Sequence, residues 1–359
     1  MRSSSLSDES GTHKRTPAFQ KIMFAVKLLL GALPLVGFYC YARFLADMYM
    51  DGEWATYKQV KAYVNGTEHH NDFLIMGDSV AQLNLNASTL SSSDCSVFNI
   101  ALRGSTPIEN YYTLKTYLDH DNTVGTILLV FTPSHYYSAD YITARTEYFH
   151  VLSMRDMFDI YRNALSYKDT KGIWNFLVST DPPILKLIQT AAFYPPKYLP
   201  AMNNAHFVRR HDINTKSAAM LEENNGSYIV THDRANAMES YANQKSFLPH
   251  PMMTLYMRRL LELCREHNIR VVIEQSPRPE IAKKNTLQSF ESDYLSYLRS
   301  FVSDFVEPPS QTALMYYDNN YFYDGAHMNK SGTVAYTQYI KQTYIAPYIH
   351  NKTTAEVIK

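Results

Sequence analysis

The stretch Phe73-Leu74-Ile75-Met76-Gly77-Asp78-Ser79 decides the fold class of this chain. Four apolar residues run into a Gly-Asp-Ser turn, and short apolar runs bounded by turn residues are typical of buried parallel strands. Similar runs follow at 97–100, 126–131, 270–274 and, more weakly, 313–316. Helical patterns lie between or after them, at 107–119, 252–267, 287–302 and 332–344. This alternation predicts an α/β fold, with a parallel sheet covered by helices on both faces.

The segment 135–249 interrupts the alternation. It has helix-like patterns at 151–167 and 183–192 and proline pairs at 182–183 and 195–196, but no clear strand pattern. A connection of this length is uncommon inside a compact domain unless it has structure of its own. We therefore predict a helical insertion beside the sheet.

The residues from Ile22 to Leu45 form an apolar run that only Lys27 and Arg43 interrupt. A transmembrane helix needs about 20 apolar residues, and long cationic side chains near its ends can reach the headgroups. The basic side is N-terminal, which keeps the first residues in the cytoplasm and carries the rest across. A cleaved signal peptide is the alternative, but no small-x-small cleavage site follows the run. A buried helix of a soluble domain is disfavoured by the charge asymmetry.

These features divide the chain. We expect a cytoplasmic tail at 1–21, a transmembrane anchor at 22–45, a juxtamembrane linker with a helix at 46–71, an α/β domain at 72–350 with the insertion 135–249, and a C-terminal tail at 351–359. The domain is then periplasmic or extracellular, held by a single span in the cell (inner) membrane.

The composition excludes some classes of function. Lys+Arg and Asp+Glu are balanced at 34 each in 359 residues, which argues against a nucleic-acid binder held by phosphate contacts. The three cysteines fit no zinc pattern, and the histidines show no ligand spacing, so we predict neither a metal nor a cofactor. Cys95 and Cys264 either pair in an exported domain or remain buried thiols.

Two separated motifs carry residues for nucleophilic chemistry. Ser79 directly follows a predicted strand, and ligands of open α/β sheets bind outside the carboxyl ends of the strands. Asp324 and His327 stand three residues apart in a turn before the last predicted helix. A carboxylate that accepts from one imidazole nitrogen leaves the other nitrogen free to take a serine proton. The two motifs together fit the arrangement of nucleophile, base and orienting carboxylate in a triad.

A third element, Asn99-Ile100-Ala101-Leu102-Arg103-Gly104-Ser105, follows the second predicted strand. A glycine there lets a backbone N–H approach a developing oxyanion with no side chain in the way. The backbone N–H of Ser79 is a second candidate donor.

Structural alternatives exist for each motif. Ser79 alone fits a helix N-cap, and His327 alone fits a turn histidine, but their ordered occurrence at two strand ends favours catalysis. Asp78 is expected to hold the turn after the first strand. Asp318 is another candidate carboxylate, but it precedes Asn319-Asn320 in a predicted turn, so we prefer Asp324.

Gly-Asp-Ser after the first strand, the glycine loop after the second and Asp-x-x-His before the last helix resemble the SGNH (GDSL-like) hydrolase family, from 72 to 348. The resemblance implies a flavodoxin-like three-layer sandwich, with Ser79 as nucleophile, His327 as base, Asp324 as orienter and Gly104 as oxyanion donor. The asparagine that this family carries after the third strand is missing, since Thr132-Pro133-Ser134-His135 stands there. Ser134 and His135 are candidates to replace it.

The anchor and the missing asparagine make the chain similar to a subgroup, the D-alanyl transfer protein of teichoic acid and the acetylating proteins of alginate and cellulose export. That similarity implies a membrane-bound O-acyltransferase as partner and an envelope polysaccharide as acceptor. We therefore expect an acyltransferase that carries an acyl group, acetyl above all, as a Ser79 ester. An esterase or deacetylase that uses water has the same residues. A non-catalytic scaffold for the acyltransferase is the third hypothesis.

Overall fold

The computed structural model describes residues 17–137, 149, 151–167, 202–237 and 246–357. The chain divides into two compact units, Met1–Ala46 and Asp47–Lys359. The first unit consists, in its described part, of little more than one helix. The second holds the sheet and every residue of the candidate site.

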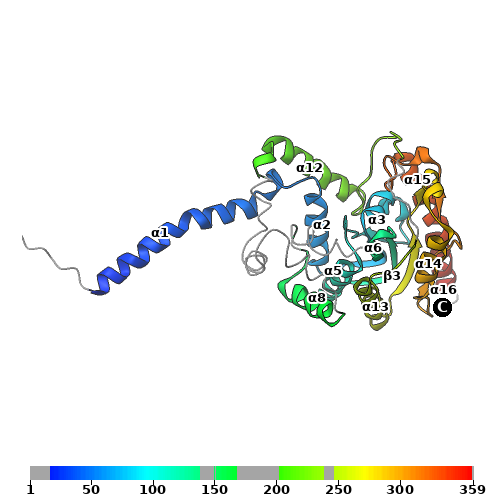
Figure 1. The fold of residues 1–359 in the computed structure, drawn as a ribbon, viewed down its shortest axis with the longest axis horizontal. Coiled ribbons are helices and arrows are strands. Elements are labelled where there is room, and N and C mark those ends of the chain that lie inside the picture. Colours follow the sequence, from blue (N-terminus) through cyan, green and yellow to red (C-terminus); the bar gives the residue numbers. More distant parts are fainter. Residues whose placement is uncertain (1–16, 138–148, 150, 168–201, 238–245, 358–359) are drawn as a thin grey trace, which may run out of the picture. The chain divides into compact units, whose positions relative to one another are not determined.

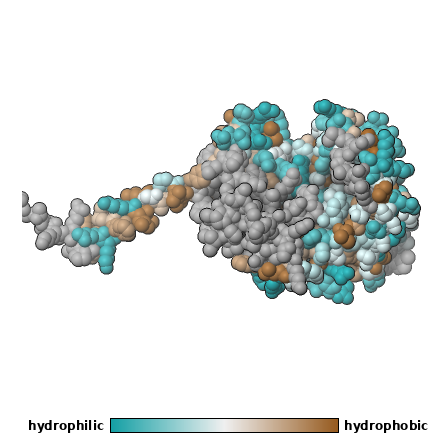
Figure 2. All heavy atoms as spheres, in the orientation of Figure 1, coloured by the Kyte–Doolittle hydropathy of each residue, from teal (hydrophilic) through white to brown (hydrophobic). Residues whose placement is uncertain are grey.

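The long apolar helix α1 (Pro17–Phe44) makes up most of the first unit (Figure 1). Its segment Ala18–Phe38 has 21 residues, a mean hydropathy of 1.8 and no buried residue. At 1.5 Å per residue this segment is ~30 Å long, which matches the hydrocarbon core of a bilayer. Apolar residues cover much of its visible face (Figure 2). The helix thus has the length and composition of a membrane anchor or a signal sequence.

The second unit is built on a five-stranded parallel sheet. Its strands are β1 (His70–Gly77), β2 (Val97–Asn99), β3 (Thr123–Phe131), β4 (Arg270–Gln275) and β6 (Val306–Glu307). They lie in the order β2-β1-β3-β4-β6, and each neighbouring pair is parallel. This is the flavodoxin-like order, so the predicted fold class is confirmed. The strand order reverses at β1 and β3, which is where such sheets bind their ligands.

The two faces of β1 show why its whole sequence is apolar. Phe73 and Ile75 pack in one cluster with Tyr336 of α15 (Lys330–Ile340). Successive side chains of a strand point to opposite faces, so Leu74 and Met76, both fully buried, face the other layer. There α5 (Pro107–Asp119) contacts β1, and α13 (Pro251–Glu266) contacts both α5 and β4.

The remaining elements complete the layers and the insertion. They include α3 (Ser79–Asn84), α4 (Ala87–Leu90), α6 (Ser134–Tyr137), α8 (Met154–Ser166), α12 (Phe207–Glu223), α14 (Gln288–Arg299), η5 (Lys341–Ile345) and α16 (Ala346–Val357). α8 and α12 lie between β3 and β4, so the predicted insertion is helical in its described part. The expected helix at 183–192 lies outside the described residues.

Two sequence expectations differ from the structure. The fifth strand of the sheet is Val306–Glu307, whereas the expected strand at 313–316 overlaps β7 (Tyr316–Tyr317), which pairs with β5 (Arg278–Pro279) in a separate small sheet. The stretch 46–71, expected as a juxtamembrane helix and linker outside the α/β domain, contains α2 (Trp54–Val64). Buried side chains line one face of α2, and the helix contacts α5 and α12. It therefore belongs to the folded unit.

Cys95 and Cys264 are both buried, free thiols in the structure. Burial, with a smaller effect from the Asp72 charge, raises the pKa of Cys95 to about 11, and burial raises the pKa of Cys264 well above the usual value. Neither is a nucleophile at neutral pH, because the thiolate is the reactive form.

Candidate active site

The turn after β1 has a backbone that only glycine tolerates. Gly77 has φ +139°, and a Cβ at this position would lie 1.8 Å from the carbonyl oxygen of Val130 on β3. The next residue, Asp78, caps α3, with its Oδ1 accepting from the backbone N–H of Val80 at 2.9 Å. Ser79 is therefore the first residue of α3, at the carboxyl edge of β1.

The carboxylate of Asp78 is fully buried and joins three loops. Its Oδ2 accepts from the backbone N–H of Thr132 at 2.9 Å and lies 3.1 Å from Nδ1 of His135. The same Nδ1 lies 2.6 Å from the carbonyl oxygen of Ser105. Asp78 is structural, as predicted. His135 uses its Nδ1 to hold these loops, and Ser134 is the first residue of α6, so their replacement of the missing asparagine stays a prediction.

His327 lies at hydrogen-bond distance from both other predicted triad residues. Nε2 of His327 is 2.7 Å from Oγ of Ser79, and Nδ1 of His327 is 2.8 Å from Oδ2 of Asp324. Because an ionised carboxylate can only accept, Nδ1 carries the hydrogen and Nε2 is left to accept from the Ser79 hydroxyl. The geometry thus satisfies each contact that a serine triad requires.

The environment of Asp324 keeps its carboxylate ionised. Burial alone would raise the pKa of Asp324, but the hydrogen bond and charge of His327 lower it, as do the backbone N–H groups of His327 and Ala326. Both N–H groups donate to Oδ1 at 2.8 Å. The pKa of Asp324 therefore lies below its usual value. The other candidate, Asp318, caps a separate turn through the N–H of Asn320 and takes no part in these contacts.

The imidazole of His327 is stacked on the ring of Tyr323, with the centroids 5.7 Å apart and the planes at 18°. Burial, with the charge of Asp324 adding to it, raises the pKa of Tyr323 to about 12, so the ring is neutral at physiological pH. The side chains of His327 and Asp324 remain 23% and 30% exposed. The site is thus open to a substrate on one side and has an aromatic wall on another.

Asn84 holds the Asp324–His327 turn against the serine helix and was not predicted from the sequence. Its Oδ1 accepts from the backbone N–H of Met328 at 2.9 Å, and its Nδ2 donates to the carbonyl oxygen of Ala326 at 3.2 Å. Asn84 is fully buried at the last position of α3, five residues after Ser79. Because α3 also carries the polar Gln82, nothing in its short sequence singles out Asn84.

The loop after β2 brings Gly104 to the same edge of the sheet. Its two ends are tied to the carbonyl oxygen of Gly77, by the N–H of Leu102 at 3.2 Å and by the hydroxyl of Ser105 at 2.7 Å. Asn110 of α5 reinforces this contact by bonding to both Gly77 and Ser105. Gly104 has φ +68°, and within the described residues its N–H donates no hydrogen bond. An oxyanion donor needs an N–H that does not already donate to another group, and the N–H of Gly104 meets this condition in the described part of the chain.

The end of the insertion lies along the triad turn. The N–H of Tyr228 donates to the carbonyl oxygen of Gln82 on α3 at 3.1 Å, and the N–H of Asn236 donates to that of Phe322 at 2.9 Å. Between them, Asp233 accepts from the backbone N–H of Ser331 at 2.8 Å. The insertion therefore flanks both the serine helix and the turn that carries His327.

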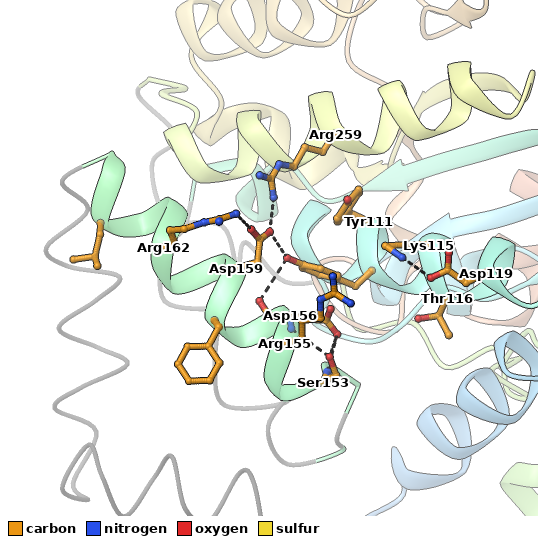
Figure 3. Close-up of a pocket in the computed structure, with 13 residues that line it drawn as sticks. Tyr111, Lys115, Thr116, Asp119, Ser153, Arg155, Asp156, Asp159, Arg162 and Arg259 are labelled. Carbon is orange, nitrogen blue, oxygen red and sulfur yellow. Dashed lines mark hydrogen bonds and ion pairs between the residues drawn. The ribbon is translucent and has the colours of Figure 1, made fainter.

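A cavity of about 980 Å³ lies away from the triad, between α5, α8 and α13 (Figure 3). Its central carboxylate, Asp159, is paired with Arg259 at 2.6 Å and Arg162 at 2.7 Å and accepts from the hydroxyl of Tyr112. Burial opposes ionisation of Asp159, but these partners bring its pKa to about 2. The contacts of the Asp159 carboxylate join α8 to α5 and α13, so its role is structural.

No family model matches the chain, and no curated protein shows significant similarity to it. Its class therefore rests on the flavodoxin-like sheet and the geometry around Ser79. That geometry can activate a hydroxyl, hold an acyl group on it and shelter the negative charge of a tetrahedral intermediate.

Proposed function

We propose that this chain is a membrane-anchored serine acyltransferase of the SGNH type, which carries an acyl group on Ser79 and passes it to an envelope polysaccharide. The observation that supports it most strongly is the line of contacts from Asp324 through His327 to Ser79. An acetyl group is the preferred cargo, by the resemblance of the motifs to acetylating proteins of polysaccharide export.

The reaction has two balanced steps. Oγ of Ser79 attacks the acyl carbonyl carbon while its proton moves to Nε2 of His327, and the donor group leaves with that proton. A hydroxyl of the polysaccharide then gives its proton to Nε2 and attacks the Ser79 ester, which returns the proton to Oγ. In both steps the N–H groups of Gly104 and Ser79 stabilise the oxyanion, and Asp324 stabilises the imidazolium.

The apolar helix α1 supports the location in this proposal. As an uncleaved anchor with its N-terminus in the cytoplasm, it holds the domain on the outer side of the cell membrane, in the periplasm or outside the cell. Acyl donors of the cytoplasm do not reach that side unaided. A membrane-bound O-acyltransferase is therefore the proposed partner, handing the acyl group across the bilayer to Ser79.

The proposal is tested in cells that carry Ser79→Ala at the native locus. Ester-linked acetate on the envelope polysaccharide should fall to the level of a deletion strain, while the variant accumulates in the membrane like the parent. Unchanged ester content would contradict the proposal. It would also leave the scaffold hypothesis, in which deletion of 22–45 abolishes acylation and Ser79→Ala does not.

Hydrolysis is separated from transfer in vitro. The purified full-length chain in detergent is given a soluble aryl acetate with and without an oligosaccharide acceptor. A transferase releases the aryl group faster when the acceptor is present and forms acetylated sugar. A deacetylase or esterase releases acetate to water at a rate that the acceptor does not change.

A further inference from the structure

The hydroxyl of Tyr57, on α2, donates a hydrogen bond to the backbone carbonyl oxygen of Arg103. That carbonyl belongs to the same peptide unit as the N–H of Gly104. A trans peptide is planar, with its C=O and N–H directed to opposite sides, so a donor that holds the oxygen also sets the direction of the N–H. The described residues contain no cis peptide bond.

Gly104 makes this peptide easy to turn. With φ +68° and no Cβ, the glycine adopts the left-handed region at little cost, and it has comparable access to other conformations. A rotated peptide would present the carbonyl oxygen of Arg103 in place of the N–H and would repel a developing oxyanion. A loop that must offer this N–H therefore needs a contact that fixes the peptide plane.

Tyr57 is itself firmly held. Its side chain is 3% exposed, and its ring is stacked on Phe149 of the insertion, with the centroids 4.1 Å apart and the planes at 14°. The side chain of Arg103 is fixed separately, because Nε donates to Oε1 of Gln82 at 2.8 Å and the guanidinium lies 4.4 Å from the ring centre of Tyr228. Tyr57 of α2 thus holds the carbonyl oxygen of the Arg103–Gly104 peptide, and Gln82 of α3 holds the side chain of Arg103.

We propose that Tyr57 is a positioning residue of the oxyanion site, whose hydroxyl keeps the N–H of Gly104 directed away from α2 and toward the acyl group on Ser79. This inference rests on the proposed function, since it assigns Tyr57 a part in the same acyl chemistry. Tyr57 does not touch the reacting atoms.

Tyr57→Phe tests the role, because it removes the hydroxyl and keeps the buried ring on Phe149. Tyr63→Phe is the matched control on the same helix. The hydroxyl of Tyr63 accepts from Asn71 at 2.7 Å, and its ring is stacked on Phe98, so it loses a comparable bond away from Gly104. Each full-length chain in detergent is treated with a fluorophosphonate, whose phosphoryl oxygen enters the oxyanion site when Ser79 attacks.

The rate of Ser79 labelling should fall about 10-fold to 100-fold in Tyr57→Phe and less than about 2-fold in Tyr63→Phe, because a lost oxyanion donor costs up to 10²–10³. With an aryl acetate, kcat should fall while KM stays unchanged, because an oxyanion donor acts in the transition state. The fraction of Tyr57→Phe that finally takes the label should equal that of the parent, whereas a loss of folded protein would lower that fraction. Labelling of Tyr57→Phe at the parent rate would overturn the inference and leave the proposed function standing. A parent that takes no label would overturn both.

A second measurement does not depend on activity. The chain has 12 glycines, so a ¹⁵N-glycine spectrum is simple, and the signal lost in Gly104→Ala identifies Gly104. That signal should move in Tyr57→Phe and stay in place in Tyr63→Phe. An unmoved signal would show that the hydroxyl does not set the peptide, and would refute the inference even if labelling slowed.

Discussion

The two sides of Ser79 are built in different ways. On the His327 side, the base and its carboxylate lie in one turn, three residues apart, and the backbone of that turn supplies two N–H groups to Asp324. On the Gly104 side, the loop is held by Asn110 of the adjoining helix α5, and by Gln82 of α3 and Tyr57 of α2, which lie 21 and 46 positions from Arg103. The first side is nearly self-contained, whereas the second depends on the rest of the fold. Substitutions should therefore affect the two sides separately.

The largest effect is expected on the His327 side. His327→Ala removes the base, and the rate of Ser79 labelling by a fluorophosphonate should fall on the order of 10⁴-fold to 10⁶-fold, as in other serine triads. His120→Ala is the control, because His120 caps the far end of α5. A His327→Ala chain that labels within about 10-fold of the parent would show that another group activates Ser79.

A smaller effect is expected when the His327 turn is loosened without touching the triad. Asn84→Ala removes the bonds to Met328 and Ala326, and a misplacement of about 1 Å can cost up to 10²-fold in rate. Labelling should slow about 10-fold to 100-fold, with a loss of about 1–3 kcal/mol in the free energy of unfolding. Asn86→Ala, which removes the cap of α4, should cost about 1 kcal/mol and leave labelling unchanged.

A double variant tests whether the His327 side and the Gly104 side act independently. If they act independently, the double variant Asn84→Ala, Tyr57→Phe should slow labelling by the product of the single effects, within about 2-fold. The measurement is the labelling rate of the four chains in one cycle. A double variant no slower than the worse single variant would mean that the two sides act as one unit.

The smallest expected effect is on stability against acid. The folded pKa of Asp324 is lowered, so its contribution to stability is complete above the unfolded value of about 3.9 and is lost as the pH falls through the folded value. Between about pH 5 and pH 2, the Tm of the parent should therefore fall more steeply than that of Asp324→Asn. Parallel curves would show that His327 and the turn do not stabilise the ionised carboxylate.

The same contrast explains what could be predicted from the sequence. The helix at 107–119 was predicted from its helical pattern with its observed bounds. The structure shows that its start is fixed locally, by a capping box of Thr106 and Glu109 around Pro107. Asp324 and His327 were predicted because their spacing alone brings them together. Ser79 was joined to them because both motifs were expected at strand ends of one parallel sheet. Ser79 does follow such a strand, whereas β7, the strand before Asp324, belongs to the separate small sheet.

The features that were not predicted depend on contacts between residues far apart in the sequence, or are too short to show a periodic pattern. The edge strand β6 has two residues, which is too short for any periodicity. The helix α2 was expected as part of a juxtamembrane segment and not of the folded unit, because its inner face is a mixture of Tyr57, Thr56 and small apolar residues. That face becomes a buried surface only against α5 and α12. The hydrogen bond from Tyr57 to Arg103 joins residues 46 positions apart, so no local sequence pattern predicts it.

The central claim is that Ser79 is an activated nucleophile, and the intact mass of the protein after fluorophosphonate treatment tests it most directly. One adduct is expected on the full-length parent and none on Ser79→Ala, with both chains showing the same thermal unfolding. An adduct that persists in Ser79→Ala, or a folded parent that takes no label, would contradict it.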